Sequence, residues 1–115
     1  MTEINTYSFG NMKVDGKQAR NDVKIIQGRV NDDWWRKEGH NCAPEDVKDI
    51  LQAGPEVLVI GTGANGVMRV DPRLKDELDK RGIELIAQKT GEAYQTFNKL
   101  EKEGRDVAGA FHLTC

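Results

Sequence analysis

The chain has 115 residues and a mass of 12.9 kDa, and its 17 basic and 19 acidic residues give a formal net charge of -2. This length suits one domain, spanning residues 1–115, with a single hydrophobic core. The scattered basic residues exclude nucleic acid as an expected partner, because sequence-independent binding needs a concentrated basic face. No stretch approaches the roughly 20 apolar residues of a membrane span, so no membrane contact is expected.

The compartment is indicated by targeting signals and cysteine usage. Residues 1–5, with the sequence MTEIN, resemble neither a signal peptide nor an Arg-rich transit sequence. Two cysteines, Cys42 and Cys115, are too few for a secreted disulfide framework, so we expect two free thiols. Together these features predict a cytoplasmic protein.

The first third of the chain has β character. A strand is predicted over Tyr7–Val14, with a bulge at Gly10-Asn11, and Asp15-Gly16 is a strong hairpin signal. A return strand follows, and Val23–Ile26 continues the β pattern. Residues 30–42 show no clear period, so we interpret them as a long surface loop.

From Ala43 onward, predicted helices alternate with apolar strands. The strands are Val57–Ile60, Ile83–Ala87 and Val107–Leu113. The helices run from Pro44 to a stop at Gly54-Pro55, from the cap Asp71 to a stop at Gly82, and over Glu92–Glu103 with Thr90 as the cap. Strands that are apolar on both faces indicate a parallel sheet covered on both sides. We predict an α/β fold, a three-layer single domain with a mixed central sheet, helices on both faces and an added N-terminal β-hairpin.

Ligands of open α/β sheets gather beyond the carboxyl ends of the parallel strands. This rule selects Gly61–Gly66, Gln88–Gly91 and His112–Cys115, which we expect to share one edge. The plainer interpretation is that the glycines only permit an irregular turn. Two helix N-termini would favour an anion at this edge, with Lys89 as the nearby base. Each of these helices already carries its own carboxylate, so a phosphate site is not favoured.

The glycine spacing Gly61-x-Gly63-x-x-Gly66 follows an apolar strand, as it does in dinucleotide-binding folds. Such a site needs a helix directly after the glycines. Here a β-like run, Val67–Val70, follows, and the next helix signal is Asp71-Pro72. No cofactor is therefore predicted.

Histidine and cysteine suggest two further kinds of site. His112 and Cys115 could form a Cys–His nucleophile pair, although side chains three apart on a strand face opposite ways. Both histidines also stand near cysteines, His40 near Cys42 and His112 near Cys115, which are the ligand types of tetrahedral zinc. The spacing matches no common zinc module, so coincidence is the preferred explanation and no metal is predicted.

Both tryptophans of the chain stand together in residues 34–40, which read WWRKEGH. In an extended segment one ring can enter the core while the other stays near the surface. Trp and Arg dominate binding hot spots, which favours a recognition surface. The alternative is structural: one Trp fills the core and Arg36 pairs with a nearby carboxylate.

Several motifs resemble those of one family of small domains. They are Tyr7-Ser8-Phe9-Gly10, Trp35-Arg36-x-x-Gly39-His40, Val57–Gly63, Lys80-Arg81-Gly82-Ile83, Thr90-Gly91-Glu92-Ala93 and Phe111–Cys115. The chain thereby resembles the α/β domain-of-unknown-function family shared with the vertebrate adipogenesis-associated domain protein and the mitochondrial complex I assembly factor 3. The resemblance implies a compact α/β sandwich and assigns no catalytic residues. The cytosolic relative is the better guide, which implies a differentiation-type role.

We therefore predict a non-catalytic interaction module that binds a protein partner in assembly or regulation. An exposed tryptophan would serve a homodimer as well as a different partner. The predicted binding surface consists of Trp35, Arg36, His40, Gly61, Thr62, Gly63, Lys89, Thr90 and His112. The alternative is a small-ligand protein or an enzyme, with the Gly61–Gly63 loop as donor and His112 or Cys115 as the reactive group.

Overall fold

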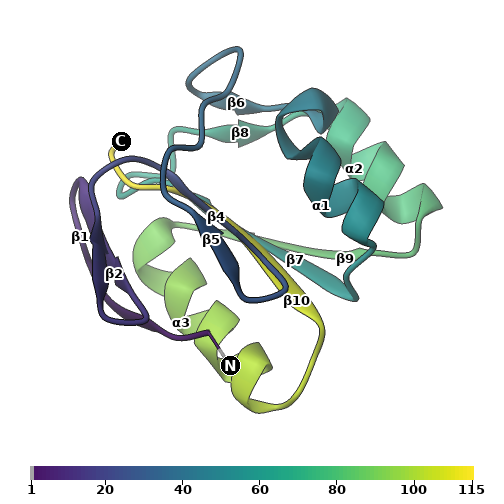
Figure 1. The fold of residues 1–115 in the computed structure, drawn as a ribbon. Helices are drawn as coiled ribbons and strands as arrows, with labels where there is room; N and C mark the ends of the chain where they lie inside the picture. The colour runs from purple at the N-terminus through teal and green to yellow at the C-terminus, as the bar shows by residue number, and fades with distance from the viewer. Residues whose placement is uncertain (1) are drawn as a thin grey trace.

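The computed structural model describes residues 2–115, whose centre is a five-stranded sheet in the order β5-β4-β10-β7-β9 (Figure 1). The strands are β4 (Val23–Ile26), β5 (Arg29–Asn31), β7 (Val57–Thr62), β9 (Glu84–Gln88) and β10 (Val107–His112). β10, β7 and β9 run parallel, whereas β4 is antiparallel to β10 and to β5. The predicted mixed sheet is confirmed.

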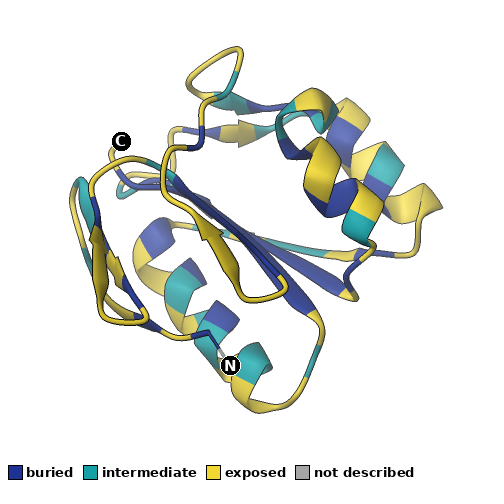
Figure 2. Cartoon of the chain, in the orientation of Figure 1, coloured by how far each residue is buried: buried dark blue, intermediate teal, exposed yellow. Residues whose placement is uncertain are grey.

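Helices cover both faces of this sheet. The short 3-10 helix η1 (Pro44–Val47), α1 (Lys48–Ala53) and α2 (Pro72–Lys80) lie on one face, and α3 (Thr90–Lys102) lies on the other (Figure 1). Side chains alternate along a strand, so Leu58 packs in one core cluster and Val59 in the other. Figure 2 shows the sheet buried between exposed outer helix faces, which confirms the three layers. Among residues 2–115, none of the helices combines the length and the apolar character needed to cross a membrane.

The N-terminal segment forms a separate antiparallel sheet of β1 (Ile4–Ser8), β2 (Asn11–Val14) and β3 (Lys17–Ala19). It packs beside α3, where the Asn98 side chain bonds both the N–H and the carbonyl of Ile4 at 2.9 and 2.8 Å. The single strand predicted over Tyr7–Val14 is wrong, because Gly10 adopts a φ of 76° and reverses the chain. The turn predicted at Asp15-Gly16 is confirmed.

Residues 30–42 contain more regular structure than the sequence indicated. They include most of β5 and the two-residue strand β6 (Asn41–Cys42), which pairs in parallel with β8 (Arg69–Val70). Strands this short cannot display an apolar period, so the prediction of a long surface loop is wrong for the residues of β5 and β6.

Two predicted helix caps have different outcomes. Asp71 caps α2, because its side chain accepts a hydrogen bond from the N–H of Arg73 at 2.9 Å. Thr90 does not cap α3. The helix begins at Thr90 itself, and the threonine hydroxyl donates instead to the carbonyl oxygen of His112 at 2.6 Å. A long-range bond has therefore replaced the local one that the sequence suggested.

Candidate functional site

The carboxyl ends of β7, β9 and β10 meet at one edge of the sheet, which we call the carboxyl edge. The hydroxyl of the buried Thr90 accepts from the N–H of Gly63 at 2.9 Å while it donates to the carbonyl of His112. Gly63 has a φ of 106°, and a Cβ there would collide with the backbone of Cys115. The glycine turn, the start of α3 and the end of β10 thus lie together.

The tail of the chain fills the glycine loop. The N–H of Ala64 donates to the carbonyl of Thr114 at 2.7 Å, and those of Asn65 and Val67 donate to the carbonyl of Cys115 at 3.2 and 3.1 Å. Since the N–H of Gly63 is also bonded, these four amides are not free to hold an oxyanion or a phosphate. α2 begins only at Pro72, so no helix starts directly after the glycines.

At the same edge, three polar side chains from distant parts of the chain form a cluster. Asp22 Oδ2 lies 2.8 Å from His112 Nδ1 and 2.8 Å from Arg36 Nη2. The second carboxylate oxygen accepts the N–H of Leu113 at 2.7 Å. The Arg36 and His112 side chains are only 4% and 7% exposed, so the cluster is largely removed from water.

The number of available hydrogen-bond donors determines which ring nitrogen of His112 carries the hydrogen. Arg36 Nη2 carries two hydrogens, and two acceptors, Asp22 Oδ2 and the Gly39 carbonyl, each lie 2.8 Å away. No Nη2 hydrogen remains for His112 Nδ1, although the two nitrogens are 3.0 Å apart. Nδ1 therefore carries a hydrogen that it donates to Asp22. In the neutral ring the acceptor is Nε2, which lies 3.5 Å from the Thr114 hydroxyl.

The electrostatics of the cluster favour the charged carboxylate. Burial by itself would raise the pKa of Asp22, but hydrogen bonds from His112, from the N–H of Leu113 and from Arg36 outweigh it and lower the pKa below its usual value. The Asp22 charge is thus stabilised and largely neutralised by its neighbours.

The two tryptophans have opposite surroundings, as the sequence indicated. Trp34 is 3% exposed and donates from its indole nitrogen to the Asp46 carbonyl at 2.9 Å. The Arg36 guanidinium stacks over its ring, 4.6 Å from the centroid. Trp35 is 75% exposed, and its indole donates to Asp33 at 2.7 Å. The structural interpretation of this segment is confirmed, since Trp34 fills the core and Arg36 pairs with Asp22. A recognition role for the exposed Trp35 stays a prediction.

The remaining predicted binding residues lie at the carboxyl edge, near the cluster of Asp22, Arg36 and His112. The His40 ring packs edge-on against that of His112, with centroids 5.7 Å apart. The Thr62 hydroxyl donates to the Gln88 carbonyl at 3.1 Å, and Lys89 lies against Gly66. A Cβ on Gly61 would fall 2.8 Å from the Thr90 hydroxyl, so this glycine is needed for close packing.

The two cysteines have different surroundings. Cys42 is buried, and burial raises the pKa of its thiol to about 12, whereas Cys115 is exposed. Across residues 2–115, no three His, Cys, Asp or Glu side chains are grouped so as to hold a metal ion.

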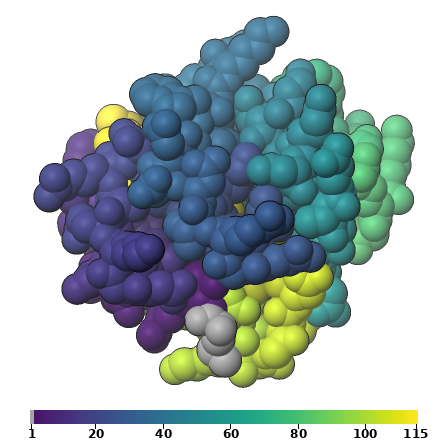
Figure 3. Space-filling model, in the orientation of Figure 1, coloured from purple at the N-terminus to yellow at the C-terminus, as the bar shows by residue number. Residues whose placement is uncertain are grey.

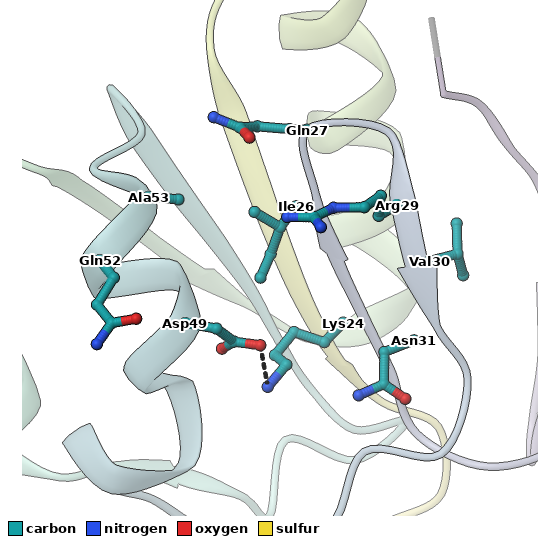
Figure 4. Close-up of a pocket in the computed structure, with 9 residues that line it drawn as sticks. All are labelled: Lys24, Ile26, Gln27, Arg29, Val30, Asn31, Asp49, Gln52 and Ala53. Carbon is teal, nitrogen blue, oxygen red and sulfur yellow. Dashed lines mark ion pairs between the residues drawn. The ribbon is translucent and has the colours of Figure 1, made fainter.

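A separate groove lies between α1 and the β4–β5 hairpin, away from the carboxyl edge (Figure 4). The buried Lys24 projects into it and forms an ion pair with Asp49 at 2.9 Å. The ammonium group also lies 3.5 Å from the Asp46 carbonyl. The positive charge of Lys24 is therefore already compensated within the chain.

Asp22, the centre of the cluster, was missed by sequence reasoning. The register pairs Val23 with Phe111, so the residue before β4 lies beside His112. An antiparallel neighbour begins at the edge where a parallel strand ends. A residue just before an antiparallel strand is therefore a candidate for a site at the carboxyl edge. It can be identified from the sequence only when the pairing of that strand with a parallel strand is known.

The comparisons with known proteins agree with this architecture. The model of a family described as "Protein of unknown function (DUF498/DUF598)" matches residues 4–112. The NADH dehydrogenase [ubiquinone] 1 alpha subcomplex assembly factor 3 of Danio rerio is 44% identical over 61 residues, which are 53% of this chain and 34% of that protein. The matched segment thus spans about a third of the zebrafish protein.

Solved structures superpose over nearly the whole chain. MT938 gives a TM-score of 0.84 at 26% identity, with 100% of both chains covered. An outer membrane protein from Bartonella henselae gives 0.87 at 26% identity, covering 99% of this chain and 96% of that one. The conserved hypothetical protein PH1505 from Pyrococcus horikoshii gives 0.80 at 27% identity, covering 98% and 99%.

Proposed function

This chain belongs to the DUF498/DUF598 family of proteins of unknown function, and we propose that it is a non-catalytic interaction module that binds a protein partner at its carboxyl edge. The role proposed for it is in assembly or regulation, in the cytoplasm. The relative from zebrafish is described as an assembly factor. Resemblance to the adipogenesis-associated protein would place this role in differentiation.

The observation that carries the proposal is the position of the exposed apolar side chains. Among residues 2–115, the large apolar side chains that are exposed are Phe9, Val30, Trp35 and Val67. Three of these four lie on segments that either bond to the last three residues or line a pocket with them. The N–H of Gly10, next to Phe9, donates to Leu113, Trp35 lines a pocket with Leu113 and Thr114, and Val67 donates to Cys115.

Three separate loops thus present apolar groups around one end of β10. Figure 3 shows the C-terminal residues in yellow at the surface, between the purple N-terminal segment and the blue segment that follows β4. Apolar side chains gathered at one place and surrounded by polar groups are typical of protein-binding surfaces. Trp35 is the expected anchor, because a large rigid ring loses little conformational entropy on binding.

The test is recovery of the binding partner by three forms of the full chain: the wild type, Trp35→Ala and Val30→Ala. Trp35→Ala is expected to lower recovery at least about tenfold, as loss of a hot-spot residue does. Val30→Ala, which changes an exposed apolar residue elsewhere, is expected to leave recovery unchanged. Equal recovery by all three folded proteins would contradict the proposal. Sedimentation of the wild type alone shows whether a second copy of the chain is the partner.

A second candidate function rests on the Asp22–His112 pair. A carboxylate on Nδ1 orients an imidazole so that Nε2 can take a proton, which is the geometry of a general base. The alternative is thus a small-ligand protein or an enzyme in which His112 activates Cys115 or a bound hydroxyl group. An enzyme of this kind predicts that a His112→Gln variant changes the alkylation rate of Cys115. An unchanged rate would exclude Cys115 as the activated group.

A further inference from the structure

Arg36 has hydrogen-bonding capacity that the chain does not use. Its Nε and Nη2 atoms donate to Gly39 and Asp22. Its Nη1 atom is buried and has no partner, which makes it the one buried side-chain nitrogen or oxygen in that state among residues 2–115. A buried, unpaired donor costs roughly 1–3 kcal/mol, and more when it belongs to a charged group. Such an atom in a folded protein therefore calls for an acceptor from outside the chain.

The guanidinium borders a pocket of about 310 Å³ at the carboxyl edge. The residues that line it include Trp34, Trp35, Leu113, Arg20 and Arg36. This volume is at the lower limit for ligand sites, which suits one side chain or a comparably small group rather than a cofactor.

The charges that line the pocket select the chemistry of its occupant. The ionisable side chains lining it are Arg20, Asp22, Arg36 and His112. Two positive charges, on Arg20 and Arg36, stand against the one negative charge on Asp22. That negative charge on Asp22 already accepts hydrogen bonds from Arg36, His112 and the N–H of Leu113. The uncompensated charge is positive, and the unpaired atom is a donor.

We propose that this pocket takes a carboxylate that carries an apolar neighbour, supplied as a Glu or Asp side chain beside a leucine-type residue in the partner protein. The carboxylate accepts from Arg36 Nη1 and from Arg20, and the apolar neighbour lies against Trp35 and Leu113. Because Nη1 is shielded from water, side chains that line the pocket shift to admit the ligand. This inference rests on the proposed function and names what the partner presents.

The experiment titrates the full chain with two short peptides, acetyl-Leu-Glu-Leu-amide and its Gln counterpart, and follows the indole N–H signals of Trp35 and Trp34 by NMR. A charge-assisted hydrogen bond should make the Glu peptide bind about tenfold more tightly than the Gln peptide. Equal affinity overturns the inference. So does failure of both peptides to bind, which would leave Nη1 bonded to an ordered water only.

Variants test which arginine causes the preference for the Glu peptide over the Gln peptide. Arg36→Lys keeps a positive charge but loses the forked donors, so the preference for the Glu peptide should vanish. Arg20→Gln, at an exposed position, is expected to fold and to weaken the preference, which decides the matter if Arg36→Lys fails to fold. Arg105→Lys is the control, because Arg105 contacts Glu56 and Glu84 away from the pocket, and it should leave both affinities unchanged.

A competition assay separates the two proposals. If Trp35→Ala lowers partner recovery but an excess of the Glu peptide does not compete with the partner, the interaction surface stands and the carboxylate pocket falls. If Trp35→Ala leaves recovery unchanged, the proposed function itself falls, whatever the peptides do.

Discussion

The Nδ1 atom of His112 lies 2.8 Å from Oδ2 of Asp22, although 90 positions separate these residues in the sequence. The contact joins the beginning of β4 to the end of β10, the central strand of the sheet. Since Asp22 also accepts from Arg36 and from the N–H of Leu113, it ties the segment after β4 and the tail of the chain to one point.

Asp22→Asn is therefore expected to destabilise the fold. Removing one partner of a buried, hydrogen-bonded ion pair costs about 3 kcal/mol. Chemical denaturation at pH 7 measures the free energy of unfolding of both proteins. A loss below about 0.5 kcal/mol, the range of ordinary surface substitutions, would show that the cluster contributes little.

The same variant has a defined pH dependence. Because the folded state lowers the pKa of Asp22, its stabilising contribution is complete above the unfolded pKa of about 4 and is lost as the pH falls through the lower folded value. The stabilisation of the wild type relative to Asp22→Asn should thus be present at pH 5 and shrink below pH 4. A difference that stays constant down to pH 2 would contradict the assignment.

Gly63 and Gly104 form a matched pair of glycines with positive φ, 106° and 78°. Alanine at either position has the backbone strain of that region, roughly 1 kcal/mol. At Gly63 the new methyl group also meets the backbone of Cys115, whereas at Gly104 nothing lies within 4 Å.

Gly63→Ala should therefore lower the unfolding free energy by about 1–3 kcal/mol more than Gly104→Ala does. It should also expose the tail of the chain, which hydrogen exchange at Asn65 and Val67 detects, because their amides bond to Cys115. Equal losses for the two variants would mean that the tail moves aside without cost.

The features that could be predicted from the sequence are those that depend on the local residue pattern. The three parallel strands and the Asp71 cap depend on neighbours within a few residues, and the carboxyl-edge rule placed Gly63 beside the tail. Asp22 and the real partner of Thr90 depend on which strands are adjacent in the sheet. The sequence shows no sign that β4 pairs with β10, so it predicted a helix cap where the fold uses Thr90 to join Gly63 to His112.

The two thiols should differ sharply in reactivity. Burial raises the pKa of Cys42 to about 12, and Cys115 is exposed. Since the thiolate is the reactive form, Ellman's reagent at pH 8 should detect one thiol in the native protein and two in denaturant. In the Cys115→Ser variant the reagent should detect no thiol in the native protein and one in denaturant. A fast-reacting thiol in native Cys115→Ser would show that the core around Cys42 opens readily.

The Cys42 pKa also has a consequence for stability at alkaline pH. The folded state holds the thiol protonated, so its contribution is complete below the unfolded pKa of about 9 and is lost as the pH rises from there toward the folded value. The wild type should lose stability between pH 9 and 11 relative to Cys42→Ala. Parallel curves for the two proteins in that range would contradict the raised pKa.

Thr90→Val tests the bond that replaces the predicted cap. Valine keeps the shape of threonine but removes the hydroxyl, so a buried N–H of Gly63 and a buried carbonyl of His112 both lose their partner. Because each buried unpaired group costs roughly 1–3 kcal/mol, the variant should lose at least about 2 kcal/mol of unfolding free energy. Thr90→Ser retains the hydroxyl and loses only a buried methyl group, so its loss should be about half as large or less. If the two substitutions destabilise equally, packing of the methyl group rather than hydrogen bonding holds the glycine loop against the end of β10.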